Sequence, residues 1–309
     1  MKQISIGTDC SGIEAPIQAM NKIVKSYTHL SYDHVFSSEI DPYAVKIIQA
    51  NYEPSILYGD MKERDVTTIP DIDMYVSGFP CQPYSIANKY KKPVDPRINL
   101  FQNCLDVIFH KRPSCFILEN VITLVTLNEG KYFNEIINQL ERDDIYHIYW
   151  MKMNSKDYGI PQSRKRVYII GVRKDVCKKE FQFPKQKKMM SLKQYIDKTD
   201  TTKHPIKEAN THLFSIIPKD SIFIDVGFRN CPFPNSGKWS PCLCAQPNLW
   251  NVAMGRKASV KEYLMLQGFP TDLKQPVSPH QMKKKIGNSM TVDVIELLMI
   301  EIFRSLEWL

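Results

Sequence analysis

Hydrophobic positions in the first 171 residues form short runs that alternate with longer segments of helical periodicity. The runs end in glycine or polar side chains, as buried strands do where they reach the edge of a sheet. Pro16 suits the first turn of the helix that follows the first run. This alternation predicts an α/β fold with a mostly parallel sheet. Strands are expected at 3–7, 34–39, up to 60, 72–77, 113–121 and 163–171, and helices from 16, over 100–109 and over 131–140.

The pattern changes between 172 and 254, where prolines, polar residues and short strand-like pieces such as 221–225 predominate. Basic residues crowd 173–188 and alternate with Phe181 and Phe183, a composition that suits contact with a phosphate backbone. Ser259 stands three residues before Glu262, a spacing that predicts a capping box and a helix start. An apolar helix is expected from 292 onward.

Composition narrows the class of protein. The 309 residues are 43% hydrophobic and 24% charged, as in an ordinary soluble globular protein, and no apolar run approaches the ~18 residues that a membrane helix needs. No signal-peptide core is found, so a cytoplasmic protein without a membrane partner is expected. The net charge of +8 permits a polyanionic partner. Eight scattered cysteines without a Cys-x-x-Cys pair argue against a disulfide framework and against a metal site.

The sequence 77–85, Ser-Gly-Phe-Pro-Cys-Gln-Pro-Tyr-Ser, carries the candidate nucleophile. Cys81 lies between Pro80 and Pro83 just after a predicted strand, where α/β folds expose reactive side chains. An isolated cysteine is more often a small buried hydrophobic residue. Two prolines make this stretch a poor core segment, so a reactive thiol is the favoured interpretation.

Polar groups follow the other predicted strands. The turn 8–16 leads from a strand to a helix start, where backbone N–H groups attract the anionic part of a ligand, although no Gly-x-Gly-x-x-Gly is present. Acids close three strands, at Glu39, Asp60 and Glu119. Such acids are often merely solvated, and the turn on its own is compatible with an ordinary βα connection. Alternation also places Gln162, Arg164 and Arg166 on one face of a predicted strand.

Together and in this order, the segments resemble the DNA (cytosine-5) methyltransferases, with Gly-Phe-Pro-Cys-Gln at 78–82, Glu-Asn-Val at 119–121 and Gly-Asn-Ser at 287–289. The resemblance implies S-adenosylmethionine as cofactor, with Glu39 on the ribose and Asp60 on the adenine amino group. It departs at 10–14, where Cys-Ser-Gly-Ile-Glu replaces Phe-x-Gly-x-Gly. The residues it implies are, for catalysis, Cys81, Glu119, Arg164 and Arg166; for the cofactor, Cys10, Ser11, Gly12, Ile13, Glu14, Glu39, Ile40, Asp60, Met61, Pro80, Leu100, Asn288 and Ser289; and for the substrate, Gln82, Ser85, Arg97, Asn120, Gln162 and Arg256.

The implied reaction is methyl transfer to C5 of a cytosine flipped out of double-stranded DNA, with the Cys81 thiolate added to C6. The expected domains are a catalytic and cofactor-binding domain at 1–178, a target-recognition domain at 179–274 and a return segment at 275–309. A monomer is expected, and a cognate restriction endonuclease as partner is left open. Two alternatives remain: a tRNA cytosine-5 methyltransferase, although its Cys-Phe-Thr signature is not found, and a catalytically weakened DNA-binding homologue.

Overall fold

The computed structural model describes residues 2–80, 100–206, 211–218, 220–227 and 237–309. Contacts between residues divide the chain into two compact units. The first comprises Met1–Met153, Lys165–Pro184 and Ile295–Leu309, and the second comprises Asn154–Arg164 and Lys185–Val294. The functional domains expected at 1–178, 179–274 and 275–309 stay a prediction, because compact units are defined by contacts and not by function.

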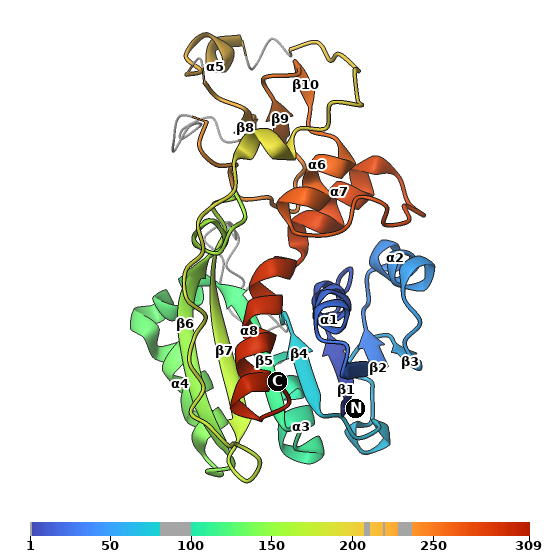
Figure 1. The fold of residues 1–309 in the computed structure, drawn as a ribbon, viewed down its shortest axis with the longest axis vertical. Helices are drawn as coiled ribbons and strands as arrows, with labels where there is room; N and C mark the ends of the chain where they lie inside the picture. The colour runs from blue at the N-terminus through green and yellow to red at the C-terminus, as the bar shows by residue number, and fades with distance from the viewer. Residues whose placement is uncertain (1, 81–99, 207–210, 219, 228–236) are drawn as a thin grey trace. The chain divides into compact units, whose positions relative to one another are not determined.

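A seven-stranded sheet forms the centre of the first unit, in the order β3-β2-β1-β4-β5-β7-β6 (Figure 1). The strands are β1 (Lys2–Asp9), β2 (Leu30–Ser38), β3 (Ile56–Tyr58), β4 (Met74–Ser77), β5 (Cys115–Val121), β6 (Tyr146–Asn154) and β7 (Lys165–Arg173). Strands β1 to β5 pair in parallel, and β7 pairs antiparallel with β5. The prediction of an α/β fold with a mostly parallel sheet is therefore confirmed.

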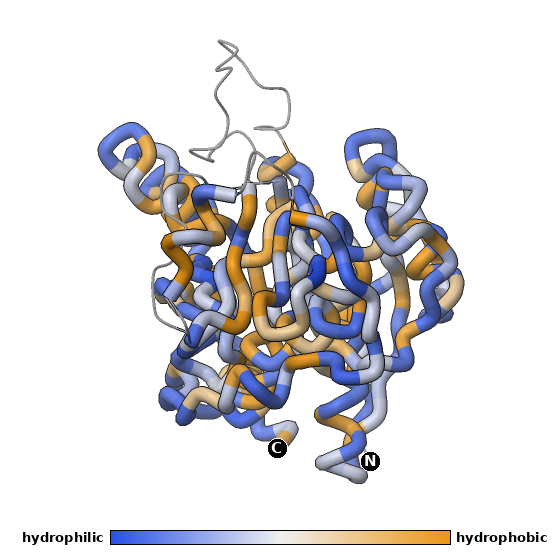
Figure 2. Tube along the Cα trace, turned by 90° about the horizontal axis from the view of Figure 1, so that it is seen from above, coloured by the Kyte–Doolittle hydropathy of each residue, from blue (hydrophilic) through white to orange (hydrophobic). Residues whose placement is uncertain are grey.

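Helices cover both faces of this sheet. They are α1 (Ala15–Ser26), α2 (Pro42–Asn51), α3 (Leu100–Lys111), α4 (Lys131–Glu141) and α8 (Val292–Ser305). Helices α3 and α4 bury their apolar sides against one face, in a core that includes Phe116 and Leu118 of β5. Helices α1 and α8 lie on the other face, joined by an ion pair of 2.7 Å between Lys22 and Glu296 (Figure 1). Hydrophobic and hydrophilic residues alternate along the coiled parts of the trace, as expected of helices that turn one side to the sheet and the other to solvent (Figure 2).

Two glycines let aromatic rings pack flat against the sheet. A Cβ atom at Gly7 would lie 2.1 Å from a ring carbon of Phe36, and one at Gly171 would lie 2.1 Å from a ring carbon of Phe116. Both rings are completely buried. Because carbon atoms do not approach so closely, the glycines are required by packing and not by a turn.

The expected elements are largely present, with some differences in their bounds. Pro16 lies in the first turn of α1, as predicted. Strand β7 begins at Lys165, so Gln162 and Arg164 precede the strand instead of alternating along it; this part of the prediction was wrong. Backbone hydrogen bonds from the N–H of Ser155 to the carbonyl of Arg164, and from the N–H of Ser163 to the carbonyl of Ser240, hold that segment as a turn. The edge strand β6 was not predicted, because its exposed and half-buried residues show no clear alternation.

Among its described residues, the second unit contains a small antiparallel sheet in the order β10-β9-β8 and several helices. Its elements are α5 (Thr211–Ser215), β8 (Phe223–Asp225), β9 (Leu249–Asn251), β10 (Arg256–Lys257), α6 (Val260–Leu266) and α7 (Pro279–Asn288). The predicted capping box is confirmed, with Ser259 and Glu262 each bonded to the other's backbone N–H. Within the described ranges, no helix has both the length and the apolar character that crossing a membrane demands.

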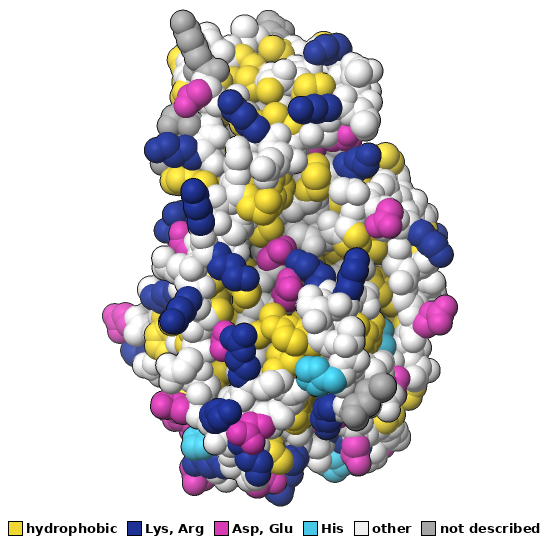
Figure 3. Space-filling model, viewed as in Figure 1, with side chains coloured by type: hydrophobic (Ala, Val, Ile, Leu, Met, Phe, Trp, Pro, Cys, Tyr) yellow, Lys and Arg dark blue, Asp and Glu magenta, His cyan; other side chains and the backbone are white. Residues whose placement is uncertain are grey.

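Positive charge is concentrated in one part of the chain. Residues 185–294 contain 17 Lys and Arg against eight Asp and Glu, an excess of nine, whereas the whole chain carries +8. The rest of the chain is therefore close to neutral. On the face shown in Figure 3, Lys and Arg side chains are scattered among hydrophobic and polar ones.

Candidate active site

The carboxyl ends of the parallel strands bring several predicted site residues to one edge of the first unit's sheet. Asp9 at the end of β1 pairs with Ser38 of β2 on one side and with Ser77 of β4 on the other. The segments that leave these strands, 10–14, 39–41 and 78–80, therefore start side by side. In open α/β sheets this edge is where ligands bind.

The turn after β1 has an unusual backbone. Cys10, Gly12 and Glu14 have φ angles of 51°, 58° and 61°, all in the left-handed region that favours glycine. A Cβ atom at Gly12 would meet no heavy atom closer than 4.0 Å, so space is open beside this residue. Glu14 is the N-cap of α1 but makes no side-chain capping bond. The turn thus presents its backbone to an open space at the start of a helix.

Glu39 faces this turn from the end of β2. Its Oε2 accepts a hydrogen bond of 2.8 Å from the N–H of Gly12, and its Oε1 accepts one of 2.8 Å from the N–H of Asp41. Burial raises the pKa of the Glu39 carboxyl above its ordinary value, although these backbone hydrogen bonds oppose the shift. The next side chain, Ile40, is 71% exposed, a large hydrophobic group that the protein leaves largely uncovered. A carboxylate and an apolar side chain are therefore adjacent at the open side of the turn.

Other predicted cofactor residues lie around the same turn. Met61 is buried, and its Sδ lies 3.9 Å from Sγ of Cys10. Burial raises the pKa of the Cys10 thiol well above its ordinary value, which keeps the thiol protonated at neutral pH. Asp60 accepts a hydrogen bond of 3.0 Å from the N–H of Lys62 and forms an ion pair with its side chain. Leu100, the first residue of α3, is buried.

Sequence reasoning missed a buried ion pair beneath the turn. Both Nη atoms of Arg64 donate to the Asp9 carboxylate at 2.8 Å, and the Tyr75 hydroxyl donates to the same group at 2.7 Å. Arg64 also bonds the Ser38 hydroxyl at 2.6 Å. This bidentate pair fixes the end of β1 against β2 and β4. Asp9, directly before the turn, was a visible signal, but nothing in the sequence connects it with Arg64, 55 residues away.

Glu119 and Arg166 meet on neighbouring strands. The Oε1 atom of Glu119 lies 3.0 Å from Nε of Arg166 in an ion pair. The same oxygen is buried and accepts no properly oriented hydrogen bond from the described residues, which leaves acceptor capacity. Next to it, Nδ2 of Asn120 donates a hydrogen bond of 3.2 Å to the carbonyl of Phe79. Strand β5 thus holds the start of the segment that leads from β4 towards Cys81.

Four predicted residues fall outside the described part of the chain. They are Cys81, Gln82, Ser85 and Arg97. Pro80 is the last described residue before them and is half-buried. Their roles stay predictions from the sequence.

The remaining predicted residues belong to the second unit. The guanidinium of Arg164 donates to the backbone carbonyls of Leu243, Gly287 and Ser289 at 2.7 to 3.1 Å. Gln162 binds backbone groups in the same way, with its Oε1 accepting from the N–H of Leu243 at 2.9 Å. These bonds connect the turn 155–164 to the segment at Leu243 and to the C-terminal end of α7, a positioning arrangement that the sequence pattern did not indicate.

Arg256 is completely buried in the second unit, where two of its nitrogens donate to Glu262 at 2.9 and 3.0 Å. Burial alone would lower the pKa of the guanidinium, but the bonds to Glu262 outweigh it and the net shift is upward. Asn288 ends α7 and Ser289 caps it. A buried, paired Arg256 has the contacts of a structural residue in this structure.

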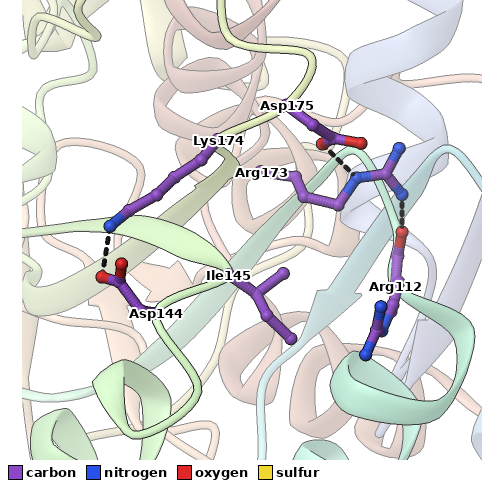
Figure 4. Close-up of a pocket in the computed structure, with 6 residues that line it drawn as sticks. All are labelled: Arg112, Asp144, Ile145, Arg173, Lys174 and Asp175. Atoms are coloured by element: carbon purple, nitrogen blue, oxygen red, sulfur yellow. Dashed lines mark hydrogen bonds and ion pairs between the residues drawn. The ribbon is translucent and has the colours of Figure 1, made fainter.

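A separate pocket of about 480 Å³ lies at the opposite edge of the sheet (Figure 4). It is lined by Arg112, Asp144, Ile145, Arg173, Lys174 and Asp175. Arg173 pairs with Asp175 and Lys174 with Asp144. Since Val172 pairs with Cys115 at the start of β5, this pocket is remote from the carboxyl edge. Two of its three cations, Arg173 and Lys174, are paired with carboxylates.

Comparison with solved structures identifies the class of fold. The Entamoeba histolytica methyltransferase EhMeth matches with a TM-score of 0.68 and 22% identity, over 98% of this chain and 99% of that one. The S. pombe Dnmt2 methyltransferase matches with a TM-score of 0.71 and 18% identity, over the same shares of the two chains. The fold is that of the S-adenosylmethionine-dependent methyltransferases.

Sequence comparison narrows the class to a family. The C-5 cytosine-specific DNA methylase family matches residues 1–304. The Type II methyltransferase M.HaeII of Haemophilus aegyptius is 33% identical over 280 residues, 88% of this chain and 86% of the relative. M.NgoBI of Neisseria gonorrhoeae is 34% identical over 278 residues, 85% and 84% of the two chains. The chain belongs to the C-5 cytosine-specific DNA methylase family, and the predictions of a DNA methyltransferase that uses S-adenosylmethionine are confirmed.

The residues at the carboxyl edge fit this cofactor. A carboxylate at the end of the second strand suits two ribose hydroxyls, and Glu39 is held there by two backbone N–H groups. The exposed side chain of Ile40 offers an apolar surface of the kind that a flat purine ring covers. The space beside Gly12 allows close approach to the turn. The carboxylate of Glu39, the apolar side chain of Ile40 and the open space beside Gly12 therefore fit S-adenosylmethionine.

Proposed function

We propose that the protein methylates C5 of a cytosine that is flipped out of double-stranded DNA at a short specific sequence, through a transient bond between Cys81 and C6. The observation that carries this proposal is Glu119. It is a buried carboxylate with remaining acceptor capacity, one residue beyond Leu118, which pairs with the last residue of β4. Four residues after that strand end comes Cys81.

The Cys81 thiol would raise the nucleophilicity of C5. C5 of cytosine is a poor nucleophile while the ring is aromatic, and addition of the Cys81 thiolate to C6 converts C5 into an enamine carbon. S-adenosylmethionine, when bound, supplies an electrophilic methyl group for that carbon. Loss of the C5 proton then allows Cys81 to leave and restores the aromatic ring.

Glu119 would act on the edge of the cytosine ring that lies opposite C5 and C6. A proton carried by the Glu119 carboxyl and donated to ring N3 would neutralise the charge that develops as sulfur adds. The carboxyl would also accept from the 4-amino group, which would distinguish cytosine from thymine. The ion pair with Arg166 holds the carboxylate in place. An oxygen that is already buried and lacks a properly oriented donor loses little solvation when such a donor arrives.

Charge supports DNA as the polymer. The excess of nine positive charges in residues 185–294 suits a phosphate backbone, and Lys and Arg side chains are spread over the face in Figure 3. Bonds to phosphates would also offset the cost of flipping a base, which is a few kcal/mol. The region between 185 and 255 is short, so we propose a short target sequence.

A covalent trap tests this function. The full-length protein would be incubated with S-adenosylmethionine and a duplex pool in which cytosine is replaced by 5-fluorocytosine, since fluorine at C5 blocks the final elimination. We expect a denaturation-resistant complex with wild type and none with Cys81→Ser. Trapping on a 5-fluorocytosine-containing tRNA but not on duplex DNA would indicate the tRNA alternative. Absence of any complex would overturn the proposal.

A further inference from the structure

Glu14 stands where the turn shared by the family has its second glycine. Its φ of 61° is one that glycine adopts without strain, and its side chain is completely buried. A glycine here would give the same backbone without a buried carboxylate. The side chain therefore contributes something that the backbone conformation alone does not supply.

The contacts of Glu14 show what it contributes. Its Oε1 accepts hydrogen bonds from the hydroxyls of Thr8 at 2.7 Å and Ser37 at 2.6 Å, and Nε2 of His34 lies 3.5 Å away. Because the single hydroxyl proton of Ser37 is donated to Glu14, the Ser37 oxygen accepts from Nε2 of His34 at 2.9 Å. One carboxylate oxygen thus joins β1 to β2, and all four side chains are buried.

The joined positions are close to the cofactor residues in the chain. Thr8 lies three residues before Ser11, and their side-chain oxygens are 2.7 Å apart. Ser37 lies two residues before Glu39, whose carboxylate accepts the N–H of Gly12 at 2.8 Å. A shift between the two strands would therefore change the spacing of Gly12 and Glu39.

We propose that Glu14 is a positioning residue for S-adenosylmethionine: its bonds to Thr8 and Ser37 hold the turn and Glu39 at the spacing that the cofactor requires. The proposal rests on the placement of the cofactor at Glu39 and Gly12. Glu14 acts on affinity through the geometry of other groups and takes no part in the chemistry. Preorganisation of this kind lowers the cost of binding without adding a bond to the ligand.

The test compares binding of S-adenosylhomocysteine by calorimetry with methyl transfer to DNA. We expect Glu14→Gly and Ser37→Ala each to raise the Kd for S-adenosylhomocysteine about tenfold, while kcat at saturating cofactor and DNA affinity in a gel shift change less than twofold. Glu14→Gln should stay within about threefold of wild type. Its amide oxygen still accepts both hydroxyls, and Oε2 accepts no bond from the described residues that the substitution would remove.

Ser305→Ala is the matched control, since it removes a buried serine hydroxyl bonded at 2.7 Å in the same unit, on α8. It should leave the Kd unchanged. The proposal would be overturned if a folded Glu14→Gly bound the cofactor with unaltered affinity. It would also be overturned if Glu14→Gln or Ser305→Ala lost as much cofactor affinity as Glu14→Gly, or if DNA binding fell in parallel. If the wild-type protein did not bind S-adenosylhomocysteine, that result would refute the placement of the cofactor itself, independently of the role of Glu14.

Discussion

At the scale of single residues, the site contains carboxyl groups that are buried away from water. Their hydrogen bonds to the protein replace only part of the lost solvation. Glu39 is the clearest case, because burial raises its pKa although two backbone N–H groups bind the carboxylate. Glu14 is completely buried and has a left-handed backbone, a conformation that costs roughly 1–2 kcal/mol for a residue with a Cβ atom. Such costs are typical of positions that are kept for binding rather than for stability.

Glu39→Gln should weaken binding of S-adenosylhomocysteine about 10- to 100-fold, because a neutral amide makes weaker hydrogen bonds to ribose hydroxyls. The ligand-free variant should gain stability relative to wild type as pH rises. A carboxyl whose pKa is raised by folding stabilises fully below its unfolded pKa, near 4.5, and this contribution is lost as pH rises through the folded value. Urea unfolding of both proteins at pH 4.5 and 7.5 measures the two free energies of unfolding. A variant that loses stability relative to wild type between these pH values would contradict the expectation.

Glu119→Gln should lower kcat about 10²- to 10⁴-fold, the range expected when a positioned acid–base group is lost, with DNA affinity changed less than threefold. Labelled-methyl transfer and a gel-shift titration supply the two quantities. Exposed Glu53→Gln is the control and should leave both unchanged. A comparable loss of DNA affinity would assign Glu119 to structure instead of chemistry.

At the scale of secondary-structure elements, close packing of rings against the strands sets the shape of the sheet. Phe116 of β5 lies over Gly171 of β7, and the two residues pair directly across the antiparallel ladder. The same arrangement joins Gly7 to Phe36 on β1 and β2. These ring–glycine pairs fill the space between neighbouring strands whose ends carry the site.

Gly171→Ala should destabilise the protein by about 1–3 kcal/mol, the usual cost of inserting a methyl group into a filled core. The added Cβ would lie 2.1 Å from a ring carbon of Phe116. Gly59→Ala is the control, since no atom lies within 4 Å of its Cβ, and its effect should stay within about 0.5 kcal/mol. Thermal unfolding of the two variants makes the comparison, and equal melting temperatures would refute the packing argument.

At the scale of the whole molecule, positive charge is concentrated in the stretch 185–294 and the remainder of the chain is nearly neutral. We therefore expect binding of DNA and binding of the cofactor to respond differently to salt. Cofactor affinity should depend little on salt, because the groups around Gly12 and Glu39 act at short range. DNA affinity should fall steeply with salt, because binding to phosphates releases counterions.

Lys187→Ala combined with Lys188→Ala should reduce the slope of log Kd against log salt by about 1.8, at ~0.9 for each phosphate that the variant no longer neutralises. Both side chains are exposed, as are Lys25 and Lys46 on α1 and α2, which form the control pair for the same double substitution. Fluorescence anisotropy with duplex DNA at several salt concentrations gives the slopes. An equal change in both double variants would show that total charge, and not the basic stretch, controls binding.

The sequence by itself determined the α/β class, most strands and helices, the family and the cofactor. Strand periodicity, the capping box and the spacing of short motifs are local properties, and each can be read within about ten residues. The turn 10–14, Glu39 and Glu119 could all be named in this way, because the turn and Glu39 directly follow a strand and Glu119 lies near the end of one.

Only the tertiary structure decided which distant residues support these positions. Arg64 on Asp9, and Glu14 between Thr8 and Ser37, depend on bonds between separate strands. It also decided that Arg164 precedes β7 and binds three backbone carbonyls. Periodicity reports which face of an element is buried but not which partner it meets, since the partner is chosen by packing across the fold.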